Sequence, residues 1–431
     1  MEEKAFPPNT KLLGIKRLDN VMKIVFIVHQ FPRVHSTFIL NEIVELIKKG
    51  HDVSIFSTDK VQEKIINKDV KRFNLLNKTY YIEDFLIKNS FRMHINYVLD
   101  KICKIMELIN KKNKLRKYID FINKNYDLKL LAKKIKEENF DIIHAGFGNN
   151  STTIAMILSK LTGIPFTFET HAYDLFVDFL FAKNKIKKAK KIFTISNYNK
   201  RYLMNEYGCP DSKIIVKRVT INEDYISKLS FLEKKDDLIM SVCRLHPIKG
   251  LEHGIEAVKL IKNKYPSLKY IIIGDGELKE GLINQVKELG LEKVVIFKGS
   301  ITNEEVFKYM RKASVFLHPS VIAKDGDRDG IPTSMIEAMY LKVPVISSKI
   351  SGIPELVDDR VNGILTDPGD VNQIAEALKK LLNNKKLREK MGGKGREKVE
   401  KEFNIEKNVK KMNDIFEKLK QLNIIKQDKI F

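Results

Sequence analysis

The stretch "DGDRDGIPTSMIEAMYLKVPVISS" (residues 325–348) contains the unit from which the fold can be predicted. Its polar loop is followed by Pro332, a residue that suits the first turn of a helix. The helical segment then leads into "VPVIS" (343–347), a continuous apolar run of the kind found in strands buried on both faces. A loop, a helix and a buried strand in this order are typical of a parallel α/β sheet.

The same unit recurs along the chain in two series. Strand-like runs of the first series lie at 23–28, 52–57, 140–145, 165–170, 191–196 and 213–216. After the charged "EKKDD" segment, the second series lies at 238–243, 269–274, 294–299, 314–318, 343–347 and 363–366. Because helical segments separate the runs, we predict an α/β protein of two doubly wound Rossmann-like domains facing across a cleft. Ligands of such sheets bind beyond the carboxyl ends of the strands.

The expected domain boundaries follow from these series. We predict a flexible tail at 1–21 and an N-terminal domain at 22–225. A C-terminal domain is expected at 235–400, followed at 401–431 by a helix that packs back on the N-terminal domain. Residues 85–138 fit the alternation least well and predict a basic helical insertion, either a solvated hairpin or a surface that touches acidic lipid. Met22 precedes the first strand and is an alternative start of the chain.

Composition excludes several classes of protein. The chain has 431 residues, and its 43% of hydrophobic residues excludes a disordered protein. The formal charge of +23 predicts an anionic partner such as nucleic acid, acidic membrane or a phosphorylated substrate, with simple lysine richness as the alternative. The cysteines Cys103, Cys209 and Cys243 are not closely spaced, which argues against a disulfide framework or zinc site. No apolar run approaches the roughly 18 residues of a spanning helix.

Two cations follow the first strand of the second series. Arg244 comes directly after this strand, and Lys249 lies five residues later. Both leave the carboxyl end of the strand, where ligands bind. A planar guanidinium and a mobile ammonium together suit a diphosphate, with a chance pair of surface cations as the alternative.

Two acids flank the helix that Pro332 opens. Asp329 lies in the loop before it and Glu337 lies within it. The amino end of this helix suits phosphate oxygens, whereas carboxylates accept hydrogen bonds from the paired hydroxyls of sugars and ribose. The alternatives are a turn residue for Asp329 and a surface acid for Glu337.

The second domain resembles the GT-B glycosyltransferases of the large retaining group called family 4. Their pattern "EGIPxxxxEAMAxGxPVV" stands here as "DGIPTSMIEAMYLKVPVI", and their "RLxxxKG" stands at 244–250. Further matches are "GDGEL" (274–278), "SGIPELV" (351–357) and "NGILTDPGD" (362–370). Two departures from the pattern are Asp329 in place of Glu and Lys342 in place of Gly.

The first domain resembles a narrower branch, the colanic acid and exopolysaccharide biosynthesis glycosyltransferases. "FPRVHSTFILNEI" (31–43) is similar to their "FPxxSETFIxNEI", and residues 144–176 are similar to their histidine-rich strand and helix. The glycine pair usual after the first strand is replaced by His29-Gln30-Phe31-Pro32. The resemblance implies that this domain binds the acceptor.

The resemblance also implies roles for single residues. Catalytic roles fall on His171, near the anomeric carbon, on Asp329, which holds hydroxyls of the donor sugar, and on Glu337, which binds ribose. The nucleotide-sugar site comprises Arg244, Lys249, Gly274, Gly330, Ile331 and Glu337. Ser36 and Thr37 are expected to contact acceptor or phosphate.

The implied activity is transfer of a sugar, by a hexosyltransferase of class EC 2.4, from a UDP- or GDP-sugar to a polysaccharide or lipid-linked glycan, with retention of configuration. No cofactor or metal is expected, since "DGD" (325–327) is the nearest Asp-x-Asp sequence and is interpreted as a loop. The nucleotide base, sugar, acceptor, linkage and oligomeric state are not predicted.

Two other functions stay open at this point, a nucleotide-sugar epimerase of GT-B architecture and a nucleic-acid binder. We favour the transferase and expect no nucleic acid as partner. We expect a cytoplasmic protein, and the basic segments 101–117 and 183–191 give the hypothesis of peripheral binding to the anionic inner face of the cell membrane.

Overall fold

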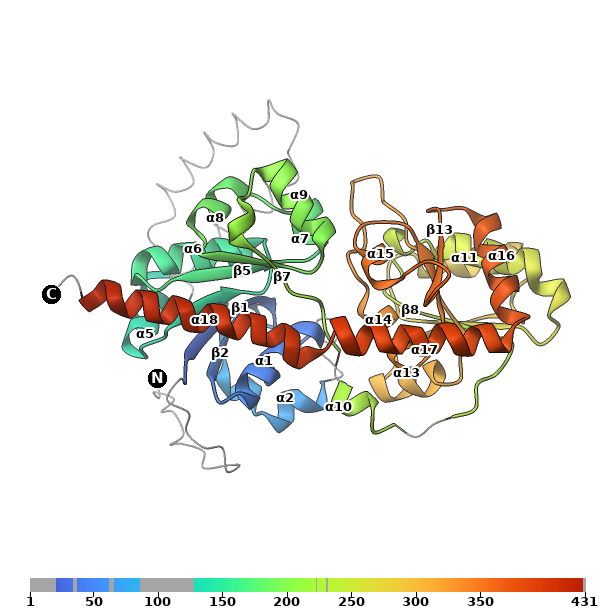
Figure 1. Cartoon of the computed structure of the whole chain (residues 1–431), viewed down its shortest axis with the longest axis horizontal. Coiled ribbons are helices and arrows are strands. Elements are labelled where there is room, and N and C mark those ends of the chain that lie inside the picture. The colour runs from blue at the N-terminus through green and yellow to red at the C-terminus, as the bar shows by residue number, and fades with distance from the viewer. Residues whose placement is uncertain are drawn as a thin grey trace.

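The computed structural model describes residues 21–33, 37–61, 66–85, 128–221, 223–229 and 232–428. Two lobes lie side by side, and each is built on its own sheet (Figure 1). Every strand pair in both sheets is parallel. The predicted α/β class with two doubly wound Rossmann-like domains is therefore confirmed.

The N-terminal sheet has seven strands in the order β3-β2-β1-β4-β5-β6-β7. They are β1 (Lys23–Gln30), β2 (Asp52–Asp59), β3 (Thr79–Tyr81), β4 (Ile142–Ala145), β5 (Phe166–Thr170), β6 (Lys191–Thr194) and β7 (Ile214–Val216). Six of these were predicted from their apolar runs. The edge strand β3 was missed because it has three residues, all of them half-buried.

Helices cover both faces of this sheet. Alternate residues of β1 point to opposite faces: Ile24 and Phe26 pack with α1 and α18 (Ile405–Asp428), whereas Val25 and Ile27 pack with α5, α6 and α8. The helices of this lobe are α1 (Thr37–Lys48), α2 (Lys68–Arg72), α5 (Leu128–Glu137), α6 (Asn150–Thr162), α7 (Tyr173–Phe176), α8 (Ala182–Lys188), α9 (Asn197–Tyr207) and α10 (Glu223–Ile226).

Most of the predicted basic insertion, residues 86–127, lies outside the described residues. The remaining part forms α5, whose Leu131, Ala132 and Ile135 are buried. These side chains belong to the same hydrophobic cluster as β4 and α6. This end of the segment is therefore part of the domain core.

The C-terminal sheet has six strands in the order β10-β9-β8-β11-β12-β13, the arrangement of dinucleotide-binding domains. They are β8 (Leu238–Val242), β9 (Lys269–Ile273), β10 (Val295–Gly299), β11 (Val315–His318), β12 (Val345–Ser348) and β13 (Gly363–Thr366). Its helices are α11 (Leu251–Ile261), α12 (Lys279–Glu288), α13 (Asn303–Met310), α14 (Thr333–Tyr340), α15 (Ile353–Leu356), α16 (Val371–Leu382) and α17 (Lys385–Glu402). Short 3₁₀ helices span Leu75–Lys78, Ile82–Phe85, Asp211–Lys213, Pro247–Lys249 and Lys262–Lys264.

The helix α18 (Ile405–Asp428) follows α17 and returns to the N-terminal lobe, so that the two helices run across both lobes (Figure 1). Val409, Met412 and Phe416 of α18 are fully buried. They share one hydrophobic cluster with β1 and α1. The core of the N-terminal domain is thus completed by residues from the other end of the chain. Within the described ranges, no helix is long and apolar enough to cross a bilayer.

Replacing Phe416 by alanine should destabilise the N-terminal domain by about 3–5 kcal/mol, because a fully buried ring is removed from a packed core. Urea unfolding followed by near-UV circular dichroism measures the loss. The matched control is Leu422→Ala on the same helix, whose side chain is 56% exposed and whose loss should cost less than about 0.5 kcal/mol. Equal costs in the two variants would contradict the packing described.

Candidate active site

Two loops meet at the carboxyl edge of the C-terminal sheet, because the strands β8 and β11 that they follow are neighbours. The Val321 N–H donates to the Ile248 carbonyl at 2.9 Å and joins the two loops. Gly250 allows this approach: its φ is +58°, and a Cβ there would lie 2.1 Å from the Pro319 oxygen. Only glycine fits such a position without strain.

An ion pair holds the same two loops together. Lys249 Nζ lies 2.5 Å from Asp329 Oδ1, and Asp329 Oδ2 accepts hydrogen bonds from Ser320 Oγ at 2.7 Å and from His318 Nε2 at 3.1 Å. Burial alone would raise the pKa of Asp329, but Lys249 and His318 outweigh it and hold the pKa well below its usual range. The carboxylate is therefore ionised. A carboxylate has about four acceptor positions, so Asp329 keeps about one for a further donor.

Arg244 lies on the same loop after β8 as Lys249, and its side chain is exposed. Its guanidinium makes no hydrogen bond or ion pair with the described residues and is free for a ligand. Its backbone is positioned by the loop after β9, since the next residue, Leu245, donates its N–H to the Asp275 carbonyl at 2.9 Å. Gly274 permits this contact, because its φ is +136° and a Cβ would lie 1.8 Å from the Cys243 oxygen.

Glu337 lies in α14, which begins shortly after Asp329. Its side chain is half-buried and has no recorded polar partner among the described residues. Although part of the side chain reaches solvent, burial raises the pKa of Glu337 to about 8. Within the part of the chain that the structure describes, no side chain caps the amino end of α14, so its first N–H groups are open to an anion.

The two residues after Asp329 face the other domain. A Cβ on Gly330 would lie 2.6 Å from Ile195 Cδ1 in the N-terminal lobe. The Ile331 side chain is buried in the hydrophobic cluster that also contains Ile195. Contact of either residue with a nucleotide sugar, as predicted, would therefore have to involve the backbone.

His171 follows β5 in the N-terminal domain and is buried. Its Nε2 lies 3.1 Å from the Gly146 carbonyl, an acceptor, so Nε2 carries the proton and Nδ1 is left as an acceptor. The ring packs against Phe38 and Phe147, at 4.6 Å and 5.2 Å between centroids. Burial lowers the pKa of His171, which keeps the imidazole neutral.

A buried ionic cluster lies beside His171 and was not predicted. Lys217 Nζ contacts Glu42 of α1 and lies 2.7 Å from Glu169 Oε2. Glu169 Oε1 lies 3.6 Å from His171 Nε2. Burial, followed by the charge of Glu169, raises the pKa of Glu42 to about 7. Burial alone would lower the pKa of Lys217, but the two acids outweigh it and raise it.

One signal in the sequence could have revealed this cluster. Glu42 occupies an inward position of an amphipathic helix, and Glu169 is the penultimate residue of a buried strand. A buried carboxylate needs a partner. A search for a cation at the carboxyl end of the same sheet would have led to Lys217, which follows β7, two strands away from β5.

The predicted acceptor contacts are only partly described. Ser36 lies outside the described residues, and Thr37 begins α1 with a half-buried side chain. At the carboxyl end of β1, where the usual glycine pair is missing, His29 Nδ1 lies 3.1 Å from Asp59 Oδ2 and 2.9 Å from Thr58 Oγ1. This edge therefore presents an oriented imidazole in place of bare backbone.

Two Rossmann-like domains in contact, one of which carries cations and acids at the carboxyl edge of its sheet, form the architecture of the GT-B class. Residues 223–398 match the model of the glycosyl transferases group 1, and residues 108–218 match that of glycosyltransferase family 4. The chain belongs to this family of glycosyltransferases.

Two relatives match along most of their length. The amylovoran biosynthesis glycosyltransferase AmsK of Erwinia amylovora is 32% identical over 420 residues, which cover 92% of this chain and 100% of the relative. The putative colanic acid biosynthesis glycosyltransferase WcaL of Escherichia coli is 28% identical over 399 residues, which cover 89% and 96%. The predicted family and branch are thereby confirmed.

Solved structures share the fold at low identity. Anabaena HepE in complex with UDP-glucose superposes with a TM-score of 0.67 at 16% identity, over 91% of this chain and 99% of the other. A variant of S. aureus TarM, in complex with UDP, fondaparinux and α-GlcNAc-glycerol, superposes with a TM-score of 0.69 at 15% identity, over 92% and 100%. These similarities establish the GT-B architecture.

The raised pKa of Glu337 predicts a pH-dependent effect on stability. The folded chain holds this proton more tightly, with a pKa of about 8 against 4.5 for an ordinary glutamate. The wild-type chain should therefore lose stability as the pH rises from about 4.5 to 8. Glu337→Gln has no carboxyl proton to release at this position and should not show this loss of stability. Thermal unfolding at successive pH values should show the advantage of the variant growing over this interval and levelling above it.

The control is Glu397→Gln on an exposed stretch of α17, which should follow the wild-type chain at every pH. An advantage of Glu337→Gln that stays constant with pH would contradict the raised pKa.

Proposed function

We propose that the chain transfers a sugar, with retention of configuration, from a UDP- or GDP-sugar to a growing exopolysaccharide or lipid-linked glycan. The family supports the transferase class. The names of the relatives support the pathway, since they denote amylovoran and colanic acid synthesis. A further relative, which covers 66% of this chain at 26% identity, is named for transfer from UDP-galactose to a diphosphoundecaprenol-linked sugar.

One observation supports the proposal: Arg244, Lys249 and the uncapped amino end of α14 follow β8 and β11, two neighbouring strands, at the carboxyl edge of the C-terminal sheet. A nucleoside diphosphate is the leaving group, so negative charge grows on its β-phosphate during transfer. Fixed positive groups that are already in place stabilise such charge strongly. The free guanidinium and the helix end bind the diphosphate, and Lys249 is held in position by Asp329.

The remaining residues recognise the sugar and the ribose. Glu337 binds ribose hydroxyls, and Asp329 offers its remaining acceptor position to the donor sugar. His171, with Nδ1 free, accepts a hydrogen bond from a hydroxyl near the anomeric carbon. The acceptor attacks from the face that the diphosphate leaves, and a departing phosphate oxygen takes its proton. This course needs no protein base.

Metal-independent transfer is part of the proposal. It rests on the cations Arg244 and Lys249, which supply at the diphosphate the positive charge that a divalent ion would otherwise bring. Among the described residues, no group of three or more His, Cys, Asp or Glu side chains could hold a metal ion. The "DGD" sequence forms a turn in which Asp325 Oδ1 accepts from the Asp327 N–H at 3.0 Å.

Product analysis tests the proposed function. The chain is incubated with UDP- and GDP-sugars, with and without an undecaprenyl-diphosphate glycan acceptor, and nucleotide release and product configuration are measured. We expect acceptor-dependent release and an unchanged anomeric configuration. Arg244→Ala and Lys249→Ala should each lower the rate by about 100- to 1000-fold, because each removes charge from the leaving group.

The control variant is Lys287→Ala, which removes an exposed cation of α12 and should leave the rate unchanged. Full activity of either site variant would contradict the role of the cations. Conversion of the donor to its epimer without acceptor would favour the epimerase instead.

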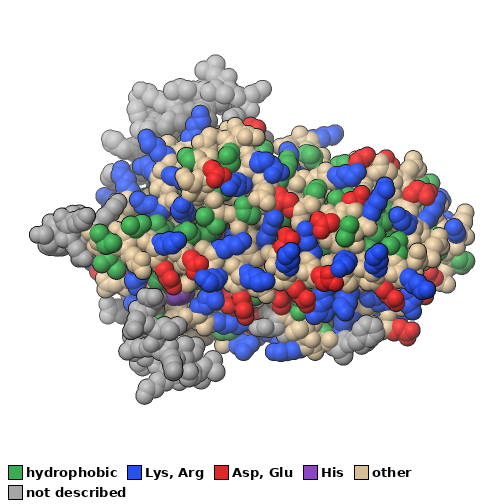
Figure 2. Space-filling view, viewed as in Figure 1, with side chains coloured by type: hydrophobic (Ala, Val, Ile, Leu, Met, Phe, Trp, Pro, Cys, Tyr) green, Lys and Arg blue, Asp and Glu red, His purple; other side chains and the backbone are tan. Residues whose placement is uncertain are grey.

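We also propose that the chain binds the anionic inner face of the cell membrane. Of the two basic segments, 101–117 lies outside the described residues, whereas α8 and the turn after it expose Lys183, Lys187, Lys188 and Lys190. Lys185 differs from this pattern, since it is buried and donates to the Gly148 and Asn149 carbonyls. Along α17 and α18, by contrast, acids alternate with the cations on the visible surface (Figure 2).

Vesicle flotation measures this binding. We expect binding to vesicles that contain anionic phosphatidylglycerol and release as the salt concentration rises, because surface charges are screened. Equal binding to neutral phosphatidylcholine vesicles would contradict an electrostatic contact.

A further inference from the structure

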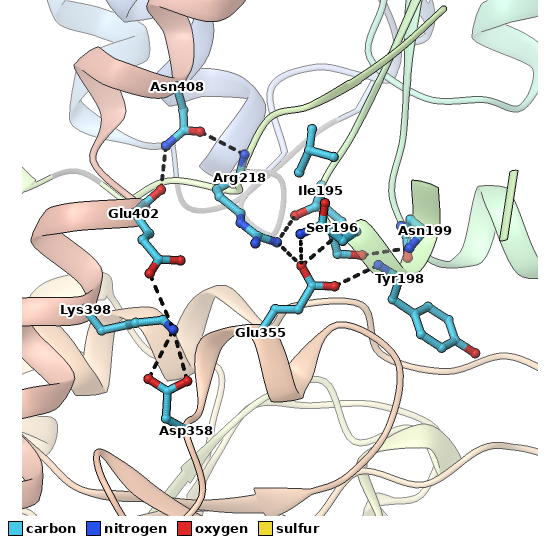
Figure 3. Close-up of polar contacts among 12 residues, drawn as sticks. Ile195, Ser196, Tyr198, Asn199, Arg218, Glu355, Asp358, Lys398, Glu402 and Asn408 are labelled. Atoms are coloured by element: carbon cyan, nitrogen blue, oxygen red, sulfur yellow. Dashed lines mark hydrogen bonds and ion pairs between the residues drawn. The ribbon is translucent and has the colours of Figure 1, made fainter. Parts of the chain in front are cut away.

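The two domains are joined at a carboxylate of the "SGIPELV" stretch, whose partners the sequence did not predict. Glu355 of α15, in the C-terminal domain, accepts hydrogen bonds from the backbone N–H groups of Asn197 at 2.9 Å and Tyr198 at 2.7 Å (Figure 3). The same carboxylate lies 2.6 Å from the guanidinium of Arg218. Burial alone would raise the pKa of Glu355, but these donors outweigh it and lower it, so the group is ionised.

These N–H groups belong to the first turn of α9, where an ionised carboxylate is favourable because the helix amino end carries partial positive charge. Glycine permits the close approach of α15. A Cβ on Gly352 would lie 3.0 Å from Ser196 Cβ and 2.9 Å from Ile331 Cγ1. The contact of Glu355 with α9 is therefore built by packing as well as by charge.

A first connection runs from this contact to the backbone of His171. Ser196 Oγ accepts the N–H of Asn199 at 3.0 Å and fixes the first turn of α9. The side-chain amide of Asn199, which is fully buried, donates to the His171 carbonyl at 2.5 Å. Glu355 of the C-terminal domain thus fixes the first turn of α9, and through Asn199 this turn fixes the backbone of His171 in the N-terminal domain.

A second connection runs to the ring of His171. Arg218, which binds Glu355, is also held by Asn408 of α18, whose Oδ1 accepts the Arg218 N–H at 3.0 Å (Figure 3). The preceding residue, Lys217, is buried, and its Nζ lies 2.7 Å from Glu169 Oε2. Glu169 Oε1 has no hydrogen-bond partner and lies 3.6 Å from His171 Nε2.

We propose that Glu355 is a positioning residue of the transfer reaction and that it fixes His171 through both connections while the domains are in contact. The inference rests on the proposed function, in which His171 acts near the anomeric carbon. Because Glu355 lies in the C-terminal domain and His171 in the N-terminal one, His171 is held in its working position only when the two domains touch. The positive groups that bind the donor follow β8 and β11, whereas Glu355 follows β12 and its carboxylate contacts Asn197, Tyr198 and Arg218 of the N-terminal domain instead of those groups.

The test compares Glu355→Gln with the wild-type chain. The amide keeps the shape but loses the charge, so the hold on α9 and on Arg218 weakens. We expect kcat to fall by about 10- to 100-fold, since small displacements of reacting groups cost this much. The donor dissociation constant, measured by calorimetry, should change by less than about twofold.

A structural readout accompanies the kinetics. Histidine ring signals are recorded by nitrogen-15 NMR, and the signal of His171 is assigned by its loss in His171→Gln. The chain has nine histidines, which keeps the spectrum readable. We expect the His171 signal to move in Glu355→Gln, because the ring loses its fixed surroundings.

The matched control is Asp358→Asn. Asp358 lies three residues further along, and its partner Lys398 Nζ, at 3.1 Å, belongs to the same domain (Figure 3). This variant also loses one carboxylate charge, yet kcat and the His171 signal should stay at their wild-type values. An equal effect of both variants would overturn the inference, because loss of charge alone would then explain it.

Other outcomes decide as clearly. Wild-type kcat in Glu355→Gln overturns the inference, and so does slow transfer with an unmoved His171 signal. If Glu355→Gln fails to fold, Asn199→Ala decides, because it breaks the first connection and leaves the domain contact in place. It must slow transfer and move the His171 signal, or the inference fails. A wild-type chain that transfers no sugar counts against the proposed function, whereas the spectra still show whether Glu355 positions His171.

Discussion

The site depends on the ion pair between Lys249 and Asp329. The two loops that carry these residues leave different strands, and one backbone hydrogen bond, a glycine contact and this pair hold them together. Both side chains are largely buried, so removal of either would leave the other charge without a partner, which is costly. The pair also makes the two cations differ in charge balance. Asp329 partly neutralises the charge of Lys249, whereas the charge of Arg244 is not balanced by a described side chain.

Much of the fold could be predicted, because buried strands and amphipathic helices each give a recognisable pattern of apolar residues over a short stretch of sequence. Twelve apolar runs become strands β1, β2 and β4–β13, whereas β3 is too short and too exposed to give a pattern. The cations after β8 and the acids around α14 could be found because position after a strand already implies the ligand edge. Their proximity follows from topology alone.

The interior polar groups could not be predicted in this way. Lys185 belongs to a stretch that resembles a solvated lysine run, and only the assembled domain shows it to be buried. Glu355 lies in a motif that the resemblance identified, but its partners come from the other domain. Such contacts join residues far apart in the chain, and no local periodicity records them.

Among the described residues, each domain holds a carboxyl group whose pKa is raised to neutrality or above, Glu42 to about 7 and Glu337 to about 8. Both owe this to burial in surroundings that favour the uncharged form. A ligand hydroxyl that donates to Glu337 would favour its ionised form. On the proposed function, in which ribose hydroxyls bind Glu337, binding of the nucleotide at the C-terminal domain would be linked to the release of a proton, whereas Glu42 is already compensated by Lys217.

The return of α18 to the N-terminal lobe affects how the chain is made. Domains usually fold in the order in which they leave the ribosome. Here β1 and α1 emerge early, but Val409, Met412 and Phe416, which complete their hydrophobic cluster, are synthesised after the whole C-terminal sheet. The N-terminal domain therefore keeps part of its apolar face uncovered until α18 has been synthesised. The C-terminal domain, although translated second, can complete its hydrophobic core first.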